Sequence, residues 1–273
     1  MDLGNFSAPR PGSDIYYALL YAPRFAREQL AIINALKREF CAIPIAVSDP
    51  GVARVKLEWW HSEVERLVAG APRHQLTQTY FRSFGGDETI GNALNVLIYG
   101  LDEELRGRYL STADQRISWF DTTFGPLYAA QASILMPTGA IAAGPWQNLG
   151  RWIEIGYSLL NLRPLAARNL VRIPQESITA AGCTLEDFKS GRSGAEVAEL
   201  VDTECGITIN HIADIIAQSP TKTRRTLRPL FTSACIVQRT LIELRDDGCR
   251  IWQHQIELTP LRKLWLAWRM RFV

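Results

Sequence analysis

The sequence predicts an all-α protein of about ten helices. Apolar residues recur at helical spacing through most of the chain, and several of these runs begin at Asp or Ser residues suited to cap a helix. No segment shows sustained alternation of apolar and polar residues, and no Asn-Gly or Asp-Gly turn joins two strand-like runs. No linker is long or polar enough to separate two domains, so we expect residues 14–273 to form one domain behind a flexible arm, residues 1–13.

The first helices are marked by caps and breakers. Asp14 is suited to cap a helix that ends near Pro23, and apolar residues at helical spacing predict a second helix over residues 24–43. Asp49-Pro50 predicts a third start, because Asp accepts free N–H groups and Pro fits the first turn. Gly70 is suited to end that helix.

The same signals predict the remaining helices. Asp87 is suited to begin one, and capping boxes are expected at Ser111–Asp114 and at Ser193–Glu196. Pro220 separates two long apolar runs. The expected helices cover residues 87–104, 111–135, 146–162, 193–219, 221–247 and 261–272.

The composition excludes several classes of function. A formal charge of +2 gives no broad electrostatic reason to expect nucleic acid as a partner. The five cysteines are scattered and form no C-x-x-C, which indicates reduced thiols rather than disulfides or zinc. The N-terminus lacks the pattern of a signal peptide, and no apolar run approaches the roughly 20 residues of a membrane span. We expect a cytoplasmic protein, with at most a peripheral contact on the inner face of the membrane.

The stretch from Tyr157 to Pro174, YSLLNLRPLAARNLVRIP, combines an apolar helix with several polar side chains and has no carboxylate. It resembles the second signature of the squalene/phytoene synthase family, in which an Asn-x-x-Arg helix runs through an Asp-x-x-x-Asp pair to a Gly-Arg-x-x-x-Pro exit. The Asn, the Arg residues and the exit Pro are present, and both aspartates are missing. The polar residues retained are Asn161, Arg163, Arg168 and Arg172.

Other stretches resemble the same family in the same order, over nearly the whole chain. They are IYYALLYAPRFAREQLAIINAL, VKLEWWHSEVERLVAGAPRHQLTQ, LIYGLDEELRGRYLST and QIELTPLRKLWLAWR. The resemblance implies an isoprenoid-synthase-type (terpenoid synthase) helical bundle around a central cavity. In active members, two Asp-rich boxes face each other across that cavity and bind the magnesium ions that hold a prenyl diphosphate.

The residues that the resemblance assigns to these boxes include no acid. The first box falls on residues 41–45, CAIPI, which contain the helix-breaking Pro44, and the second falls near residues 164–167. Tyr99 stands where many members have an aspartate. This pattern resembles a degenerate branch of the family that includes a mitochondrial factor for the assembly of respiratory complex I. Among the 28 acids, only Glu243 and Asp247 are found as a pair at i, i+4, and that pair is typical of a solvated helix end.

The missing acids favour a non-catalytic protein. Magnesium beside phosphates is usually held through one or two carboxylates, and the diphosphate released from an allylic substrate needs stabilisation that a metal supplies. We therefore expect no catalytic residue, no metal ligand and no cofactor. The hypothesis is a binding or assembly protein with a prenyl or other apolar ligand, a protein partner, or both. The alternative is a divergent prenyltransferase that condenses prenyl diphosphates with Mg²⁺, using Arg side chains and remote acids.

The candidate ligand-binding residues are those that the resemblance implies around the cavity. Arg side chains match phosphate oxygens in bidentate fashion, and the equally weighted alternative for them is ion pairing at helix ends. Two acids fall near the expected cavity mouth, where an ion-paired surface role is the more ordinary interpretation. The candidates are Glu39, Glu58, Asn161, Arg163, Arg168 and Arg172.

Two aromatic features have both a core and a surface interpretation. Trp59 and Trp60 point about 100° apart on a helix, so at most one faces the cavity, and core packing is favoured for each. The apolar face of the last helix adjoins basic residues, as in a helix lying at a lipid interface. We expect instead that this face closes the bundle, because five large apolar groups are most favourably buried against the protein. The face consists of Leu261, Leu264, Trp265, Trp268 and Phe272, beside Arg262, Lys263, Arg269 and Arg271.

The basic run from Lys222 to Arg228 is the other charged surface that the sequence indicates. Its ordinary interpretation is a solvated helix start, and a charge-steered partner site is the alternative.

Overall fold

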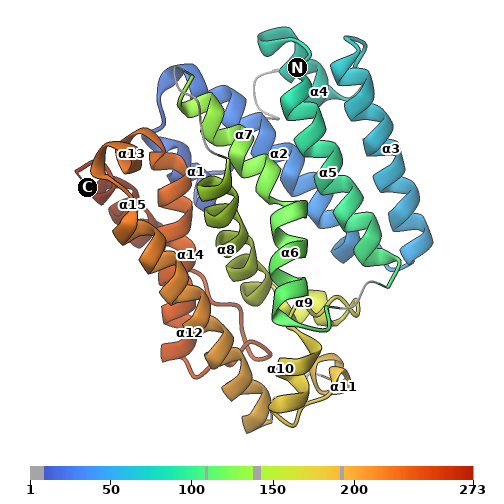
Figure 1. The fold of residues 1–273 in the computed structure, drawn as a ribbon, viewed down its shortest axis with the longest axis vertical. Helices are drawn as coiled ribbons and strands as arrows, with labels where there is room; N and C mark the ends of the chain where they lie inside the picture. Colours follow the sequence, from blue (N-terminus) through green and yellow to red (C-terminus); the bar gives the residue numbers. More distant parts are fainter. Residues whose placement is uncertain (1–8, 108–109, 138–142, 191–193, 273) are drawn as a thin grey trace.

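The computed structural model describes residues 9–107, 110–137, 143–190 and 194–272, and within these ranges it contains helices and no strand (Figure 1). This confirms the all-α prediction. The described residues form fifteen helices rather than about ten, because several expected helices are divided and short ones occur in the connections. The helices are α1 (Asp14–Leu20), α2 (Arg24–Ala46), α3 (Pro50–Val68), α4 (Gln75–Phe84), α5 (Glu88–Leu105), α6 (Ala113–Thr123), α7 (Gly125–Leu135), α8 (Gly144–Leu160), α9 (Leu162–Ala166), α10 (Gln175–Ala180), α11 (Leu185–Lys189), α12 (Ala195–Gln218), α13 (Thr221–Thr226), α14 (Arg228–Asp246) and α15 (Pro260–Arg269).

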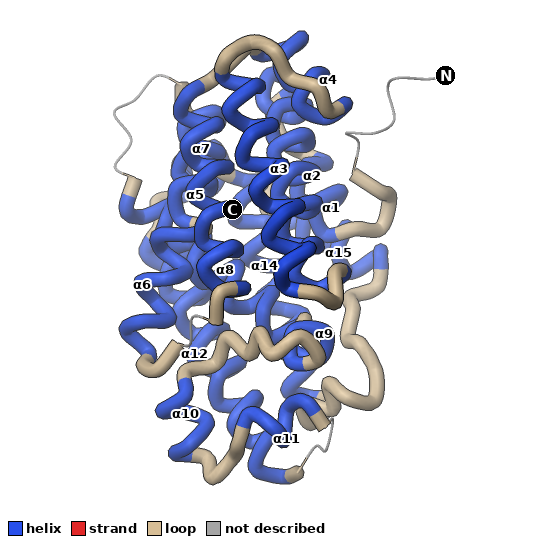
Figure 2. Tube along the Cα trace, turned by 90° about the vertical axis from the view of Figure 1, so that its right-hand side faces the viewer, coloured by secondary structure: helices blue, strands red, loops and turns tan. Residues whose placement is uncertain are grey.

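The long helices pack as a bundle in which α7 and α8 connect two outer groups. On one side α3 packs on α5, and on the other α12 and α14 pack on each other and on α8 (Figure 1). The short helices α10 and α11 lie together at one end of the bundle (Figure 2). One hydrophobic cluster extends from Leu19 to Met270, so the two groups share a core.

Glycines allow the central helices to approach closely. A Cβ atom at Gly150 of α8 would lie 2.4 Å from the Tyr128 ring of α7, and one at Gly156 would lie 2.3 Å from Val237 of α14. Because these two positions have no side chain, α8 lies close to both α7 and α14. These three helices contribute to the wall of the cavity.

The Asp caps are confirmed for α3 and α5. Asp49 accepts the Val52 N–H at 3.0 Å, and Asp87 accepts the Thr89 N–H at 2.9 Å. The cap predicted at Asp14 is wrong by one residue, because the Ser13 hydroxyl accepts the Tyr16 N–H and Asp14 lies in the first turn.

The predicted capping boxes have different outcomes. Ahead of α6 the box is shifted, since Thr112 rather than Ser111 accepts the Gln115 N–H at 3.2 Å. The box at Ser193–Glu196 cannot be assessed, because Ser193 lies outside the described residues, and α12 begins after Gly194.

Prolines divide helices that the sequence analysis treated as continuous. Helix 111–135 is two helices that meet at Phe124, with Pro126 in the first turn of α7, and helix 221–247 breaks at Leu227, just before Pro229 of α14. Pro164 lies within the separate short helix α9. Pro44, expected to break its helix, lies inside α2, which continues to Ala46. A proline this close to a helix end removes few hydrogen bonds, so the helix tolerates it.

The paired tryptophans and the last helix have contrasting outcomes. Trp60 is buried against Phe40, as predicted, whereas the core packing expected for Trp59 is wrong, since 44% of this residue is exposed. The expectation that the apolar face of the last helix closes the bundle is wrong. Every residue of that face is exposed; α15 buries Lys263 and Ala267 instead, and Met270 directly after it is also buried.

Candidate ligand cavity

A cavity of about 780 Å³ lies among α2, α7, α8 and the non-helical segment before α15. Residues 9–13, part of the predicted arm, also line it. The volume lies within the usual range for small-molecule sites, ~300–1,000 Å³. Apolar residues form much of the wall, among them Ala31, Ala35, Ile45, Phe124, Leu160 and Leu165.

A buried ion pair crosses the cavity wall. Lys37 of α2 pairs with Glu154 of α8, and the Tyr128 hydroxyl donates to the same Glu154 oxygen at 2.6 Å. Lys37 also lies 5.3 Å from the centre of the Tyr128 ring. Both charges are therefore compensated by neighbours within the protein.

Burial keeps the thiol and phenol groups of this wall neutral. Burial, and then the charge of Glu154, raise the pKa of the Cys41 thiol to about 12. Burial raises the pKa of Tyr128 and Tyr157 well above the usual value of a phenol, with contributions from Glu154 at Tyr128 and from Asp14 at Tyr157. At neutral pH these groups are protonated, so Cys41 is not a thiolate nucleophile.

The other buried cations of the wall are also paired. Arg172 donates from Nε and Nη2 to the two oxygens of Glu104, at 2.6 and 2.7 Å, and stacks 5.1 Å from the centre of the Trp119 ring. Lys263 of α15 pairs with Asp14 at 2.6 Å and donates to the Gly12 carbonyl at 3.1 Å. The pKa of Arg172 is raised overall, since Glu104 outweighs the effect of burial, which alone would lower it.

Arg168 joins the two stretches where the resemblance places the missing acids. Its Nε donates to the Ile45 carbonyl at 2.9 Å. That carbonyl is among the last four of α2, which have no partner within the helix, so Arg168 caps the helix and complements its dipole. A direct hydrogen bond therefore connects stretch 41–45 to the segment after α9.

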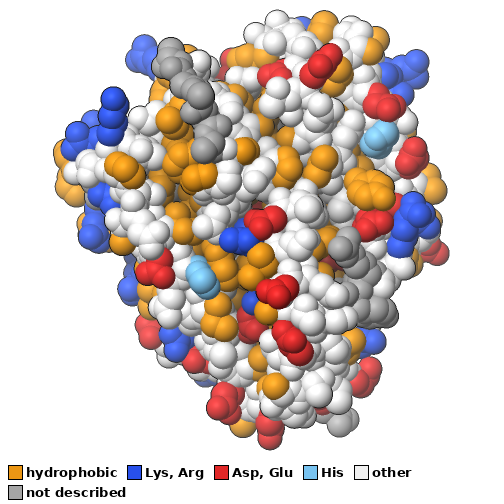
Figure 3. All heavy atoms as spheres, in the orientation of Figure 1, with side chains coloured by type: hydrophobic (Ala, Val, Ile, Leu, Met, Phe, Trp, Pro, Cys, Tyr) orange, Lys and Arg blue, Asp and Glu red, His pale blue; other side chains and the backbone are white. Residues whose placement is uncertain are grey.

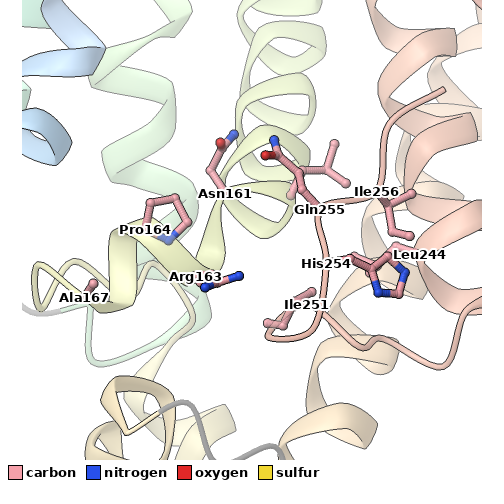
Figure 4. A pocket seen from close by; sticks show the side chains of 10 residues that line it. Asn161, Arg163, Pro164, Ala167, Leu244, Ile251, His254, Gln255 and Ile256 are labelled. Atoms are coloured by element: carbon pink, nitrogen blue, oxygen red, sulfur yellow. The ribbon is translucent and has the colours of Figure 1, made fainter. Parts of the chain in front are cut away.

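Asn161 and Arg163 lie at a smaller neighbouring pocket of about 340 Å³. In Figure 4 they face the segment that carries Ile251, His254 and Gln255, across the space between that segment and α9. Asn161 lines both pockets and donates to the Tyr157 carbonyl at 2.8 Å, whereas Arg163 lines only the smaller one.

The six candidate residues are thus not brought together. Asn161 and Arg172 line the main cavity, Arg163 lines the smaller pocket, and Arg168 binds backbone. Glu39 is half-buried beside Arg38, and Glu58 is exposed on α3, and neither lines the main cavity.

The donor set of the cavity does not fit a magnesium site. Three acids line it: Glu154 and Asp14 are held by Lys37 and Lys263, and Glu257 is exposed at the rim. Within the described ranges no group of three or more His, Cys, Asp or Glu side chains is arranged to hold a metal ion.

The sequence did not indicate that Lys37, Glu154 and Lys263 line the cavity, where they supply three of its buried charges. Lys37 and Glu154 are 117 positions apart, so no local pattern pairs them. One available signal was a lysine or glutamate interrupting an otherwise apolar stripe, as Lys37 does in α2 and Glu154 does in α8.

The chain matches the family model described as squalene/phytoene synthase over residues 8–265. Its fold is similar to a dehydrosqualene synthase solved in complex with a ligand, at 13% identity and a TM-score of 0.74, covering 95% of this chain and 90% of that one. It is also similar to squalene synthase HpnC from Alicyclobacillus acidocaldarius, at 16% identity and a TM-score of 0.65, covering 85% and 88%. YisP from Bacillus subtilis gives 13% identity and a TM-score of 0.58, covering 93% and 89%.

At these identities the similar structures establish the fold and not an activity. No curated protein sequence matches this chain. No helix in the described part of the chain is long and apolar enough to cross a membrane.

Proposed function

Because the chain belongs to the squalene/phytoene synthase family, we propose that it is a non-catalytic binding or assembly protein that keeps the family's cavity for an apolar ligand. The observation that carries this proposal is the pairing of charges around the cavity. Lys37, Arg172 and Lys263 each bind an acid of the same chain.

The buried charges of this cavity offer no unpaired partner to a magnesium diphosphate, and the other charged residues that line it, Arg10, Arg38 and Glu257, are exposed. Magnesium would need carboxylates, and Glu154 and Asp14 already neutralise cations. A diphosphate would need cations, and each buried one would have to leave its acid. Separating a buried pair leaves an uncompensated charge, at a cost of about 3–5 kcal/mol.

An uncharged or weakly polar chain of the prenyl type fits better. It would lie against the apolar wall and needs hydrogen-bonding partners only at one end. Asn34 and Asn161 line the cavity and could bind such a polar end without disturbing an ion pair. The ligand seen in the dehydrosqualene synthase structure supports the use of this fold for ligand binding.

The alternative, a divergent prenyltransferase, requires the Arg side chains to act together on a diphosphate. Arg163, Arg168 and Arg172 line different pockets or bind backbone, which favours the binding protein. We expect the purified protein, given farnesyl or geranylgeranyl diphosphate and Mg²⁺, to release no pyrophosphate above background. Release that disappears in EDTA would overturn the non-catalytic proposal.

Ligand binding is tested by native mass spectrometry of the purified protein and by titration with a prenyl alcohol. Ala35→Phe narrows the cavity from α2, and Ala69→Phe adds the same group at an exposed site at the end of α3. We expect the first variant to lose bound lipid and the second to keep it, both with unchanged circular dichroism. Equal binding by both variants would show that the ligand lies elsewhere.

A further inference from the structure

Helix α15 has the reverse of the usual arrangement of side chains. It buries Lys263 beside Asp14 and exposes large apolar groups, with Leu261 78% and Trp265 53% exposed, and Phe272, just after the helix, is 62% exposed. Leu264 and Trp268 complete this surface. A contiguous exposed face of this kind marks an interaction site more often than a solvated helix.

Basic residues surround the exposed face. Residues 260–272 contain four basic residues and no acid, and residues 221–228 also contain four and none. A hydrogen bond of 3.1 Å from Arg228 Nε to the Met270 carbonyl joins the two segments. Figure 3 shows Lys and Arg side chains gathered at the upper left edge, where Figure 1 places α13 and α15.

Most of this positive charge is not neutralised within the protein. Lys222, Arg225, Arg269 and Arg271 form no ion pair among the described residues, whereas Arg262 binds Glu243 at 2.9 Å. Burial, together with the nearby charges of Arg271 and Arg225, lowers the pKa of Arg228. A net charge of only +2 for the whole chain makes this concentration a local feature.

A groove beside the face has room for an acyl chain. Its volume is about 560 Å³, and it is lined by apolar side chains of α12, α14 and α15, among them Ile216, Ile242 and Leu266. Arg239, Arg262 and Arg269 also line it, so a chain in the groove would have cations beside its polar end.

We propose that the exposed face of α15, with the basic residues of α13, docks on an anionic lipid bilayer. Trp265 and Trp268 would lie at the level of the head groups, with the rings in apolar surroundings and the N–H groups in contact with water. The unpaired Arg and Lys side chains would bind acidic head groups. An acidic protein would satisfy the cations, but it would leave five large apolar residues without a partner, so the bilayer is the better match.

The test is flotation of the whole chain with vesicles of phosphatidylcholine alone and of phosphatidylcholine with phosphatidylglycerol. We expect binding to the anionic vesicles only, weakened by high salt. Arg269→Gln/Arg271→Gln should weaken binding to the anionic vesicles about thirtyfold, because each basic residue near an anionic surface raises the affinity by a factor of about five. Trp265→Ser/Trp268→Ser should abolish it at moderate lipid concentration.

The matched control is Val55→Ser/Tyr99→Ser, which removes exposed apolar groups from α3 and α5 on the opposite side of the bundle. This variant should bind as the unchanged protein does. No binding to anionic vesicles, or binding that the Trp variant retains, would overturn the proposal and leave a protein partner as the occupant. Membrane docking and ligand binding in the cavity are tested by different variants, because neither Ala35→Phe nor Ala69→Phe lies on α15.

Discussion

At the scale of single residues, Arg168 and Arg172 make direct contacts within the folded chain. The resemblance placed them where a diphosphate would bind, yet Arg168 caps α2 through the Ile45 carbonyl and Arg172 binds Glu104 with two hydrogen bonds. Both partners lie far away in sequence, at separations of 123 and 68 residues. The guanidinium groups of Arg168 and Arg172 therefore stabilise the folded chain and are not free to bind a ligand.

The same role is predicted for the pair Lys37–Glu154. Lys37→Met or Glu154→Met alone should lower the free energy of unfolding by about 3–5 kcal/mol, because each leaves a buried charge unpaired. The loss of unfolding free energy in the double variant should be smaller than the sum of the two single losses. The difference, which is the coupling energy of the pair, should be about 1–3 kcal/mol. Urea unfolding of the four proteins measures this coupling, and additive losses would show that the two charges act independently.

Glu63 gives a prediction about pH. Burial acts to raise its pKa, but hydrogen bonds from the His74 N–H, Thr77 and the Arg73 N–H bring it below its ordinary value. A lowered pKa in the folded state contributes stability above the unfolded value of 4.5, and this contribution is lost as the pH falls through the folded pKa. Glu63→Gln should therefore cost about 1.5–3 kcal/mol at pH 7 and progressively less below pH 4.5.

The control for Glu63 is Glu65→Gln on the same helix, whose carboxylate is exposed and only 3.9 Å from His61. The unfolding free energy of Glu65→Gln should match that of the unchanged protein at pH 7 and at pH 3.5. A loss for Glu63→Gln that is the same at pH 7 and pH 3.5 would contradict the assignment.

At the scale of helices, the close crossing of α7 and α8 depends on Gly150. In Gly150→Ala the new Cβ would meet the Tyr128 ring at 2.4 Å, so the ring or a helix must move. We expect a loss of about 1–3 kcal/mol, the usual cost of overpacking a core. Because Tyr128 also donates to Glu154, the cavity wall should be disturbed, and binding of an apolar ligand should weaken.

Gly206→Ala on α12 is the matched helical control, since its nearest neighbour outside the helix is 3.6 Å away. It should be neutral or stabilise by up to about 1 kcal/mol, as Ala favours a helix over Gly. Thermal unfolding of both variants distinguishes a packing effect from a general effect of removing glycine.

Helix starts were largely predictable from the sequence, and the orientation of the last helix was not. Asp49 and Asp87 cap helices a few residues away, so the interaction is local and its signal lies in the sequence itself. The face that α15 buries depends on Asp14 and the Gly12 carbonyl, about 250 residues earlier. The predicted apolar stripe is present, but it faces away from the core of the bundle.

At the scale of the molecule, the helical bundle around a cavity followed from the order of resembling stretches, and the content of the cavity did not. The resemblance assigned the stretch 41–45 to the wall, and Cys41, Ala42 and Ile45 do line it. Pro44 was expected to break the helix there, but α2 continues past it to Ala46. The ion pairs that neutralise the cavity join α2 to α8 and α15 to α1, and such pairs follow only from the three-dimensional packing.

Restoring acids to this wall tests the whole arrangement. Cys41→Asp/Ala42→Asp/Ile45→Asp returns carboxylates to α2, but the opposite segment around α9 supplies none, and Glu154 and Glu104 already lie close enough to raise the pKa of Cys41. Ala42 is exposed, but Cys41 and Ile45 are half-buried, and unpaired acids at these two positions should destabilise the protein by about 2 kcal/mol, or roughly 5 °C in Tm. With prenyl diphosphate and Mg²⁺ we expect no pyrophosphate release. Val52→Asp/Val55→Asp, on the exposed face of α3, adds acids without this loss. A triple variant that is as stable as the parent and releases pyrophosphate with Mg²⁺ would contradict the proposal. It would show that the wall tolerates acids and that carboxylate side chains alone are enough for turnover.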